Sequence, residues 1–187
     1  MSTSSLHTRR LVLIPCSIQM AQAALRDRDG LESRLGAQAP EEWPGLDLRE
    51  FLPLYARQLQ ADAALLGWGI WLMVHAAERM VIGDAGFKGI PGREGTVEIG
   101  YSVLPVYRGQ GFATEAARAL VDWALAQRDV RGIIAECSPD NAASIRVLKK
   151  LGMQRGQTGG SLLRWQLTKH LTQSPPAPGP SPRRLPA

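Results

Sequence analysis

The segment from Val97 to Ala116, VEIGYSVLPVYRGQGFATEA, is the part of the chain that most constrains its fold. Apolar residues alternate with polar or small ones up to Val103, which is the pattern of a strand with one buried face. Pro105 ends that pattern, two glycines follow within a short turn, and apolar residues then recur at helical spacing. The segment therefore predicts a strand, a glycine turn and a helix.

The glycine turn is a candidate binding site for phosphate groups. The helix after it leaves its first backbone N–H groups unpaired at the positive end of the helix dipole, with Arg108 beside them. The glycines could instead serve turn geometry alone. The spacing could also open a dinucleotide fold with Glu136 as the ribose-binding acid, but Thr114 stands where that motif needs a third glycine. The chain after this segment is also too short to form the second mononucleotide-binding half of a dinucleotide fold. A single glycine turn of this kind suits a ligand with a pyrophosphate group at one end.

Two blocks of sequence carry a resemblance to a known family. Arg108-x-x-Gly111-x-Ala113 matches a Q/R-x-x-G-x-G/A signature, and residues 138–153, SPDNAASIRVLKKLGM, form an asparagine-led helix at the expected distance. Together they resemble the GNAT acetyltransferases, whose signature loop binds the pyrophosphate of acetyl-coenzyme A (acetyl-CoA). The segments GDAGFKG and EIGYSVLP resemble the branch of that family that acetylates the N-termini of ribosomal proteins. The resemblance implies an acetyl-CoA-dependent N-acetyltransferase.

The fold class implied by the resemblance is α/β, with the GNAT-like acyl-CoA N-acyltransferase fold: a central mixed sheet splayed between its fourth and fifth strands, with helices on both faces. Sequence periodicity predicts strands at residues 10–16, 68–75, 80–88, 97–103, 132–137 and 161–168, and helices at 18–35, 48–64, 114–128 and 141–151. The adjacent Ile133 and Ile134 predict a fifth strand that is buried on both faces and parallel to the fourth. Pro53 fits the second helix only in its first turn.

Length and composition predict one folded domain followed by a tail. The 187 residues suit a single domain, which we expect over residues 1–172. Residues 173–187 are rich in proline and contain no acid, so this segment cannot bury enough apolar surface to fold. The net charge of +5 includes two arginines of the tail, and without a clustered basic face it does not indicate nucleic-acid binding.

The remaining composition indicates a cytoplasmic protein that does not bind membranes. No apolar run reaches the length of a membrane span, and the polar start MSTSSLHTRR lacks a secretory pattern. Cys16 and Cys137 form neither a disulfide framework nor a metal-ligand spacing, so no metal is expected. His75, at a strand end, is expected to be structural. The sequence leaves a monomer and a homodimer open.

The residues expected to contact acetyl-CoA come from the signature loop and the asparagine-led helix. They are Tyr101, Ser102, Val103, Arg108, Gly109, Gln110, Gly111, Phe112, Ala113, Thr114 and Asn141. The Asn141 side-chain amide could bond the amides of the pantetheine arm, although capping of the helix would also explain an asparagine there. Backbone N–H groups near Val103 or Leu104 are expected to bind the oxyanion, because Pro105 has none.

The chemistry of acetyl transfer to an amine favours an α-amine as the acceptor. The nucleophile must be neutral, and at neutral pH this costs a lysine amine, with a pKa near 10.4, about 4 to 5 kcal/mol, against about 1 kcal/mol for an α-amine near 7.8. A weak base is therefore enough for an α-amine. Glu98, on the polar face of the central strand, and Glu136, on the strand after the crossover helix, are the candidate bases. Each could equally lie on a solvated face or in an ion pair.

The leaving thiolate needs a proton, and the source of that proton departs from the family pattern. The family commonly uses a tyrosine in the last helix, where this chain has Leu148. Ser144 lies one helical turn after Asn141 and is the candidate acid in its place, which the resemblance to the ribosomal-protein branch supports. It could also be an ordinary surface serine. An acetyl-cysteine on Cys137 is disfavoured, because no histidine lies near it in the sequence.

The expected function is transfer of an acetyl group from acetyl-CoA to a primary amine by direct attack, with coenzyme A as the product. The N-terminal α-amine of a protein or peptide is the first choice of acceptor. A small amine, such as an antibiotic or a polyamine, is the alternative that Glu41, Glu42 and Asp47 keep open, because acid-rich loops favour a cationic acceptor. A coenzyme A-binding domain without turnover also stays open, given the missing tyrosine.

Overall fold

The computed structural model describes residues 4–156 and 160–169 of the chain. Its strands are β1 (Leu6–His7), β2 (Leu11–Pro15), β3 (Ile70–His75), β4 (Met80–Phe87), β5 (Thr96–Val103), β6 (Gly132–Cys137), β7 (Gln154–Arg155) and β8 (Leu163–Thr168). Its α-helices are α1 (Ile18–Arg26), α2 (Arg28–Leu35), α3 (Leu46–Ala61), α4 (Phe112–Ala126) and α5 (Ala142–Lys150), with 3₁₀ helices at Ala63–Leu65 and Pro105–Tyr107. The tail predicted at residues 173–187 lies outside the described residues.

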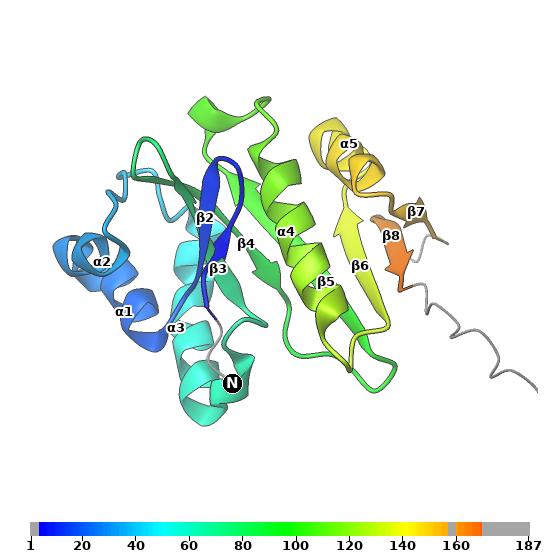
Figure 1. The fold of residues 1–187 in the computed structure, drawn as a ribbon, viewed down its shortest axis with the longest axis horizontal. Coiled ribbons are helices and arrows are strands. Elements are labelled where there is room, and N and C mark those ends of the chain that lie inside the picture. The colour runs from blue at the N-terminus through cyan, green and yellow to red at the C-terminus, as the bar shows by residue number, and fades with distance from the viewer. Residues whose placement is uncertain (1–3, 157–159, 170–187) are drawn as a thin grey trace, which may run out of the picture.

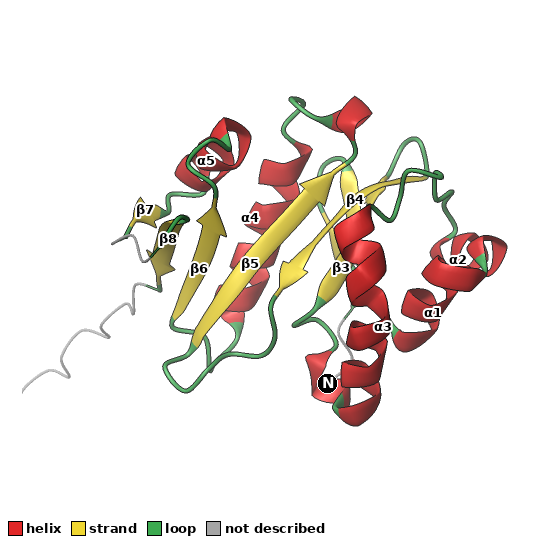
Figure 2. Ribbon diagram, turned by 180° about the vertical axis from the view of Figure 1, so that it is seen from behind, coloured by secondary structure: helices red, strands yellow, loops and turns green. Residues whose placement is uncertain are grey.

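These strands form one mixed sheet with helices on both faces. The order is β1-β2-β3-β4-β5-β6-β8-β7, in which β5 and β6 are parallel and the other neighbouring pairs are antiparallel. Figure 1 shows α4 in front of β5, with α5 on the same side of the sheet. Figure 2, from behind, shows α3 in front of β3 and β4, with α1 and α2 next to it. The predicted mixed α/β architecture is confirmed.

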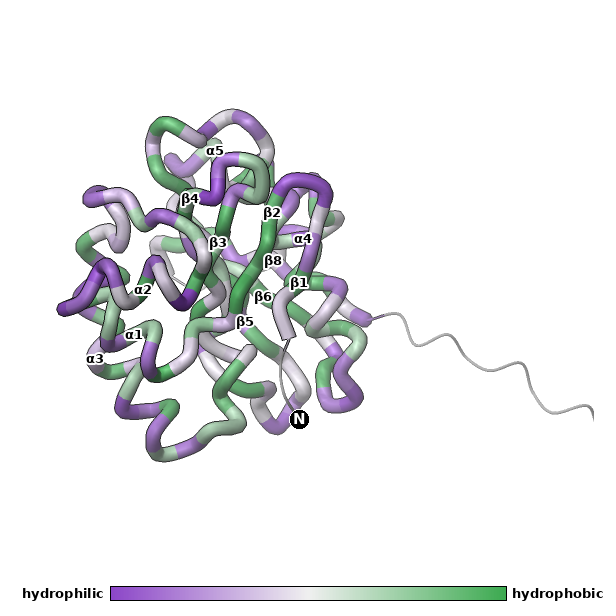
Figure 3. Tube along the Cα trace, turned by 60° about the vertical axis from the view of Figure 1, so that its left-hand side comes forward, coloured by the Kyte–Doolittle hydropathy of each residue, from purple (hydrophilic) through white to green (hydrophobic). Residues whose placement is uncertain are grey.

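Two hydrophobic cores, one on each face of the sheet, hold the layers together. On β3, Trp71 and Met73 pack into the core under α4, whereas Ile70, Leu72 and Val74 pack into the core under α1, α2 and α3. This alternation follows from the two-residue period of a strand, and it buries β3 on both faces. Figure 3 shows hydrophobic residues along the strands and hydrophilic residues on the outward turns of the helices.

The parallel strands β5 and β6 pair over only three residues. Thr96, Val97 and Glu98 lie opposite Gly132, Ile133 and Ile134, and the pairing ends there. β5 nevertheless stays paired with β4 up to Val103, so the sheet opens between β5 and β6 towards α5, as Figure 2 shows. The predicted splay is confirmed; the strands predicted as fourth and fifth are β5 and β6 because the short β1 adds a strand before them.

Two of the predicted helices differ from the structure. The helix predicted over residues 18–35 begins after the Ser17 N-cap as expected, but it breaks at Asp27, whose side chain accepts a hydrogen bond from the Gly30 N–H and caps α2. The second helix begins at Leu46, so Pro53 lies inside α3 rather than in its first turn. Proline has no N–H, so this position lacks one helical hydrogen bond.

The burial of β6 also corrects the prediction. Ile133, Ala135 and Cys137 are buried in the core under α4, but Glu136 on the opposite face is exposed. The predicted burial on both faces is therefore wrong, because α3 covers β3 and β4, and no helix of the described residues covers the back of β6 (Figure 2). The predicted parallel pairing with β5 is confirmed.

Candidate functional site

The glycine turn places the first N–H groups of α4 at the open end of β5. Gly109 and Gly111 have φ angles of 76° and 85°, in the left-handed region that disfavours residues with a side chain. Gly111 is the N-cap of α4 and contributes no side-chain cap to the N–H groups that follow it. Those of Phe112, Ala113 and Thr114 have no partner within the helix, so they can serve a bound anion.

Arg10, in the turn between β1 and β2, contacts the glycine turn and the first turn of α4. Its Nε lies 2.7 Å from Glu115 Oε2, its Nη1 donates to the Gln110 carbonyl at 3.0 Å, and its guanidinium lies 4.1 Å from the ring centroid of Phe112. Burial raises the pKa of Glu115, but the hydrogen bonds from Thr8 and Arg10 outweigh it and the net pKa is lowered. Glu115 therefore stays ionised, and the turn is held in one geometry.

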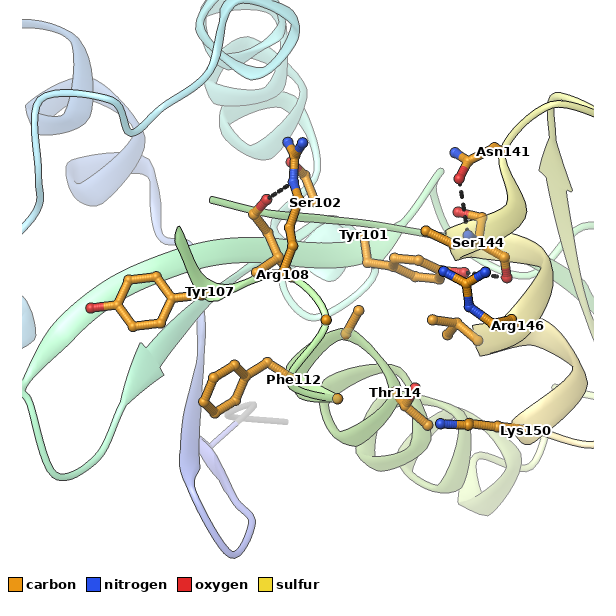
Figure 4. Close-up of a pocket in the computed structure, with 16 residues that line it drawn as sticks. Tyr101, Ser102, Tyr107, Arg108, Phe112, Thr114, Asn141, Ser144, Arg146 and Lys150 are labelled. Carbon is orange, nitrogen blue, oxygen red and sulfur yellow. Dashed lines mark hydrogen bonds between the residues drawn. The ribbon is translucent and has the colours of Figure 1, made fainter. Parts of the chain in front are cut away.

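A cavity of about 440 Å³ lies between the end of β5, the glycine turn and α5. Its lining consists of Tyr101, Ser102, Val103, Tyr107, Arg108, Gly109, Gly111, Phe112, Ala113, Thr114, Asn141, Ala143, Ser144, Arg146, Val147 and Lys150. Three of these residues are cationic and none is acidic. Figure 4 shows Lys150 of α5 extending towards Thr114 at the start of α4. A cavity with this lining attracts anions.

The cavity brings together all but one of the residues expected to contact acetyl-CoA. The exception is Gln110, whose side chain donates to the Val106 carbonyl at 3.1 Å. The cavity is also lined by five described residues that the sequence did not predict: Tyr107, Ala143, Arg146, Val147 and Lys150. Arg146 and Lys150 are four residues apart on α5, which puts them on one helix face, and this spacing was the signal that could have found them.

At the end of β5, one backbone N–H group points into the gap between β5 and β6, which is called the split below. The Leu104 N–H donates to the Ile82 carbonyl at 2.9 Å, so it belongs to the ladder with β4 and is not free for an oxyanion as expected. Alternate residues of a strand point their N–H groups to opposite edges, so the Val103 N–H points towards the split. The Val103 carbonyl accepts a bond from Arg108 Nε at 2.9 Å, which Figure 4 shows.

The start of α5 forms the other wall of the cavity. The Asn141 side-chain oxygen accepts a bond from the Ser144 N–H at 3.0 Å, so Asn141 is an N-cap and its amide NH₂ remains available to donate. The Tyr101 hydroxyl donates to the Ser144 carbonyl at 3.4 Å, and burial raises the pKa of Tyr101. Leu148 is 1% exposed and packs into the core under α4, so its position offers no acid to the cavity.

Glu98 and Glu136 lie outside the lining of this cavity. Each glutamate forms an ion pair, which the sequence analysis gave as the alternative to a role as the base. Glu98 pairs with Lys88, and Glu136 Oε1 lies 3.5 Å from Arg164 Nη1. They lie on the back of β5 and β6, on either side of the point where the two strands part. The cavity is therefore lined by residues that were predicted to contact acetyl-CoA, but not by the two glutamates that were predicted as bases.

Comparison with known proteins identifies the family. Residues 17–154 match the family described as "Acetyltransferase (GNAT) domain". The uncharacterized N-acetyltransferase YjdG of Bacillus subtilis (strain 168) is 31% identical over 160 residues, which cover 86% of this chain and 95% of that protein. The chain belongs to the GNAT acetyltransferase family. It is therefore an acetyl-CoA-dependent N-acetyltransferase, as the signature loop implied.

Solved GNAT structures share the fold at low sequence identity. The ribosomal-protein-S5-alanine acetyltransferase of Vibrio fischeri superposes with a TM-score of 0.62 at 17% identity, covering 90% of this chain and 98% of that one. The microcin C7 self-immunity acetyltransferase MccE, in complex with acetyl-CoA and AMP, superposes with a TM-score of 0.61 at 15% identity, covering 89% and 97%. Across residues 4–156 and 160–169, no helix of this GNAT chain combines the length and apolarity needed to cross a membrane.

Proposed function

We propose that this GNAT enzyme acetylates the N-terminal α-amine of a protein or peptide by direct attack of the amine on acetyl-CoA. The observation that carries the proposal is the cavity itself: three cations and no acid, at a helix N-terminus, beside a backbone N–H at the open end of β5. The α-amine is favoured because it loses its proton at little cost near neutral pH. Among fold neighbours, the Vibrio fischeri enzyme is named for a ribosomal-protein alanine.

In this proposal the cavity residues divide the binding of acetyl-CoA between them. The N–H groups of Phe112, Ala113 and Thr114 hold the pyrophosphate, and the left-handed glycines let the backbone approach it. Arg146 and Lys150 add positive charge on the opposite wall. The Asn141 amide donates to a carbonyl of the pantetheine arm, and the Val103 N–H stabilises the oxyanion that forms at the acetyl carbonyl. Acetyl-CoA supplies an activated acetyl group with a good leaving group.

The Ser144 side chain lines the same cavity and is proposed to pass a proton to the leaving thiolate. Ser144→Ala should lower kcat by about 10- to 100-fold, since a positioned proton donor is lost. Coenzyme A affinity should change little, because the Asn141 cap uses the Ser144 backbone N–H, which alanine keeps. Steady-state kinetics with calorimetry checks this, with Ser138→Ala outside the cavity as the control. A Ser144→Ala enzyme with full kcat would remove serine from the mechanism.

Direct attack also predicts that Cys137 is dispensable. Its side chain is 7% exposed, packs into the core under α4, and does not line the cavity. Cys137→Ala should keep most of the turnover, measured with the same acceptor as the wild type. An acetylated Cys137 seen in the intact mass after mixing with acetyl-CoA would contradict direct attack. Both cysteines are free and buried, which is compatible with the reducing cytoplasm where we propose that the enzyme acts.

One screen tests the choice of acceptor. Wild-type enzyme and acetyl-CoA are incubated with peptide amides of the form X-Ala-Ala-Ala, in which X is each of the twenty amino acids, with N-acetylated lysine peptides, and with spermidine, and the products are read by mass. Transfer to α-amines supports the proposal. Transfer to spermidine alone favours the small-amine alternative, for which the exposed Glu41, Glu42 and Asp47 provide negative charge. Coenzyme A binding without transfer would indicate a domain without turnover.

A further inference from the structure

The acceptor side of the split is the face opposite α4 and α5. The coenzyme A cavity occupies the α4–α5 side, so an amine that meets the thioester at the split must come from the other face. That face is made of the back of β5, the β4 strand beside it, and the segment at residues 36–45 that leads into α3 (Figure 2). Ser102 lines the cavity at this edge, and Asp84 of β4 lies directly opposite it in the ladder.

Asp84 has a half-buried carboxyl group that is held by a tryptophan. Its Oδ2 accepts a bond from Trp43 Nε1 at 3.2 Å. In the part of the chain that the structure describes, no lysine, arginine or histidine forms an ion pair with it. Burial raises the pKa of Asp84 to about 6, and the Trp43 bond only partly opposes that rise. Asp84 is thus ionised at neutral pH but close to the point of taking a proton.

The groups around Asp84 do not neutralise its charge. In the sheet, Asp84 lies between its two ladder partners, the fully buried Leu72 on β3 and Ser102 on β5. The Cys16 thiol at the end of β2 interacts with Asp84, and burial, reinforced by that carboxylate, raises the pKa of Cys16 to about 12, so the thiol is neutral. Burial likewise raises the pKa of Tyr55 on α3, which keeps the phenol neutral. A carboxylate in such surroundings is therefore stabilised further when a cation binds beside it.

The two glutamates near the split differ from Asp84 in this respect. Glu98 and Glu136 each have a cationic partner, Lys88 and Arg164 respectively. Taking a proton would break an ion pair in both cases. Among residues 4–156 and 160–169, Asp84 has no such pair to lose, and its pKa near 6 suits a base at neutral pH. Of these three carboxylates, Asp84 is therefore the one that could bind an ammonium group without first losing a cationic partner in the described residues.

We propose that Asp84 binds the ammonium group of the acceptor and takes one proton from it, with Trp43 as the residue that positions the carboxylate. This proposal rests on the proposed function. The ammonium gives one proton to Asp84, and the nitrogen lone pair then forms a bond to the acetyl carbon. The carbon–sulfur bond breaks with its electron pair going to sulfur, and the nitrogen passes its second proton to the thiolate by way of Ser144. Asp84 finally releases its proton to water, so the sum is amide, thiol and one proton.

The first test is the pH dependence of Asp84→Asn with Ser-Ala-Ala-Ala amide as the acceptor. At pH 7 kcat/KM should fall by about 5- to 10-fold, while coenzyme A affinity stays unchanged, because the variant can use only the α-amine that is already neutral, which is about one molecule in seven at this pH. The defect should shrink as the pH rises past about 8. Asparagine can still accept the Trp43 bond, and Asp122→Asn on the exposed side of α4 is the matched control. A pH-independent defect or none overturns the proposal, as does a pH-dependent loss in Glu98→Gln instead.

The second test does not need turnover. The carboxyl ¹³C signal of Asp84, assigned by its loss in Asp84→Asn, is titrated in the full-length enzyme with coenzyme A bound. Ser-Ala-Ala-Ala amide should lower the apparent pKa of Asp84, and the N-acetylated form of the same peptide should not, because only the first presents an ammonium. If this response is seen without any acetyl transfer in the screen, the amine site stands and the proposed function fails. If transfer occurs without the response, the function stands and Asp84 is not its amine site.

Discussion

Replacing Gly111 with glutamate is expected to lower the affinity for coenzyme A by about 1,000-fold, while circular dichroism stays native. The new side chain would stand at the N-cap of α4, where the pyrophosphate is proposed to bind, and would bring a carboxylate against it. Losing charge-assisted hydrogen bonds worth about 1.5 to 3 kcal/mol each, and adding repulsion, accounts for roughly 4 kcal/mol. Titration calorimetry with coenzyme A measures the change.

Backbone strain must be separated from the loss of binding. Gly111 has a φ of 85°, so any side chain there costs about 1 to 2 kcal/mol of stability. Gly152, after α5, has a φ of 81°, has open space where a Cβ would stand, and lies outside the cavity lining. Gly152→Glu should therefore lose similar stability but keep its affinity for coenzyme A. Equal affinities in the two variants would mean that the turn does not hold the pyrophosphate.

The cofactor side of the site could be predicted because its residues are close together in the sequence. Strand alternation, Pro105 and the glycines of one short segment fix the end of β5, the turn and the start of α4. The Asn141 cap is equally local, because it bonds to Ser144 three residues away. Such features depend on short-range geometry, which a single sequence expresses directly.

The acceptor side could not be predicted in this way. Asp84 lies beside β5 because the β4–β5 ladder sets it opposite Ser102, and its environment depends on Trp43, which is 41 residues away in the sequence. Nothing local distinguishes it from a solvated aspartate. The break at Asp27 was missed for a related reason: helical periodicity continues across it, and only the competing cap ends α1.

The same unpaired carboxyl predicts that Asp84→Asn makes the enzyme more stable at neutral pH. The folded-state pKa of Asp84 is raised from 3.8 to about 6, so the folded protein holds this proton more tightly than the unfolded chain does. The free energy of unfolding should therefore decrease as the pH rises from about 4 to 6, by at most about 3 kcal/mol, and stay reduced above that range.

Asparagine carries no charge at any of these pH values, so the variant avoids this loss. We expect Asp84→Asn to raise Tm by several degrees at pH 7.5 and by much less near pH 4, where the wild-type carboxyl is protonated in the folded state and partly protonated in the unfolded chain. Calorimetry of both proteins at pH 4, 5, 6 and 7.5 measures the difference. A variant that is less stable at pH 7.5 would show that Asp84 has a stabilising partner. A gain in stability together with a loss of turnover is the combination expected of a charge that is kept for its substrate.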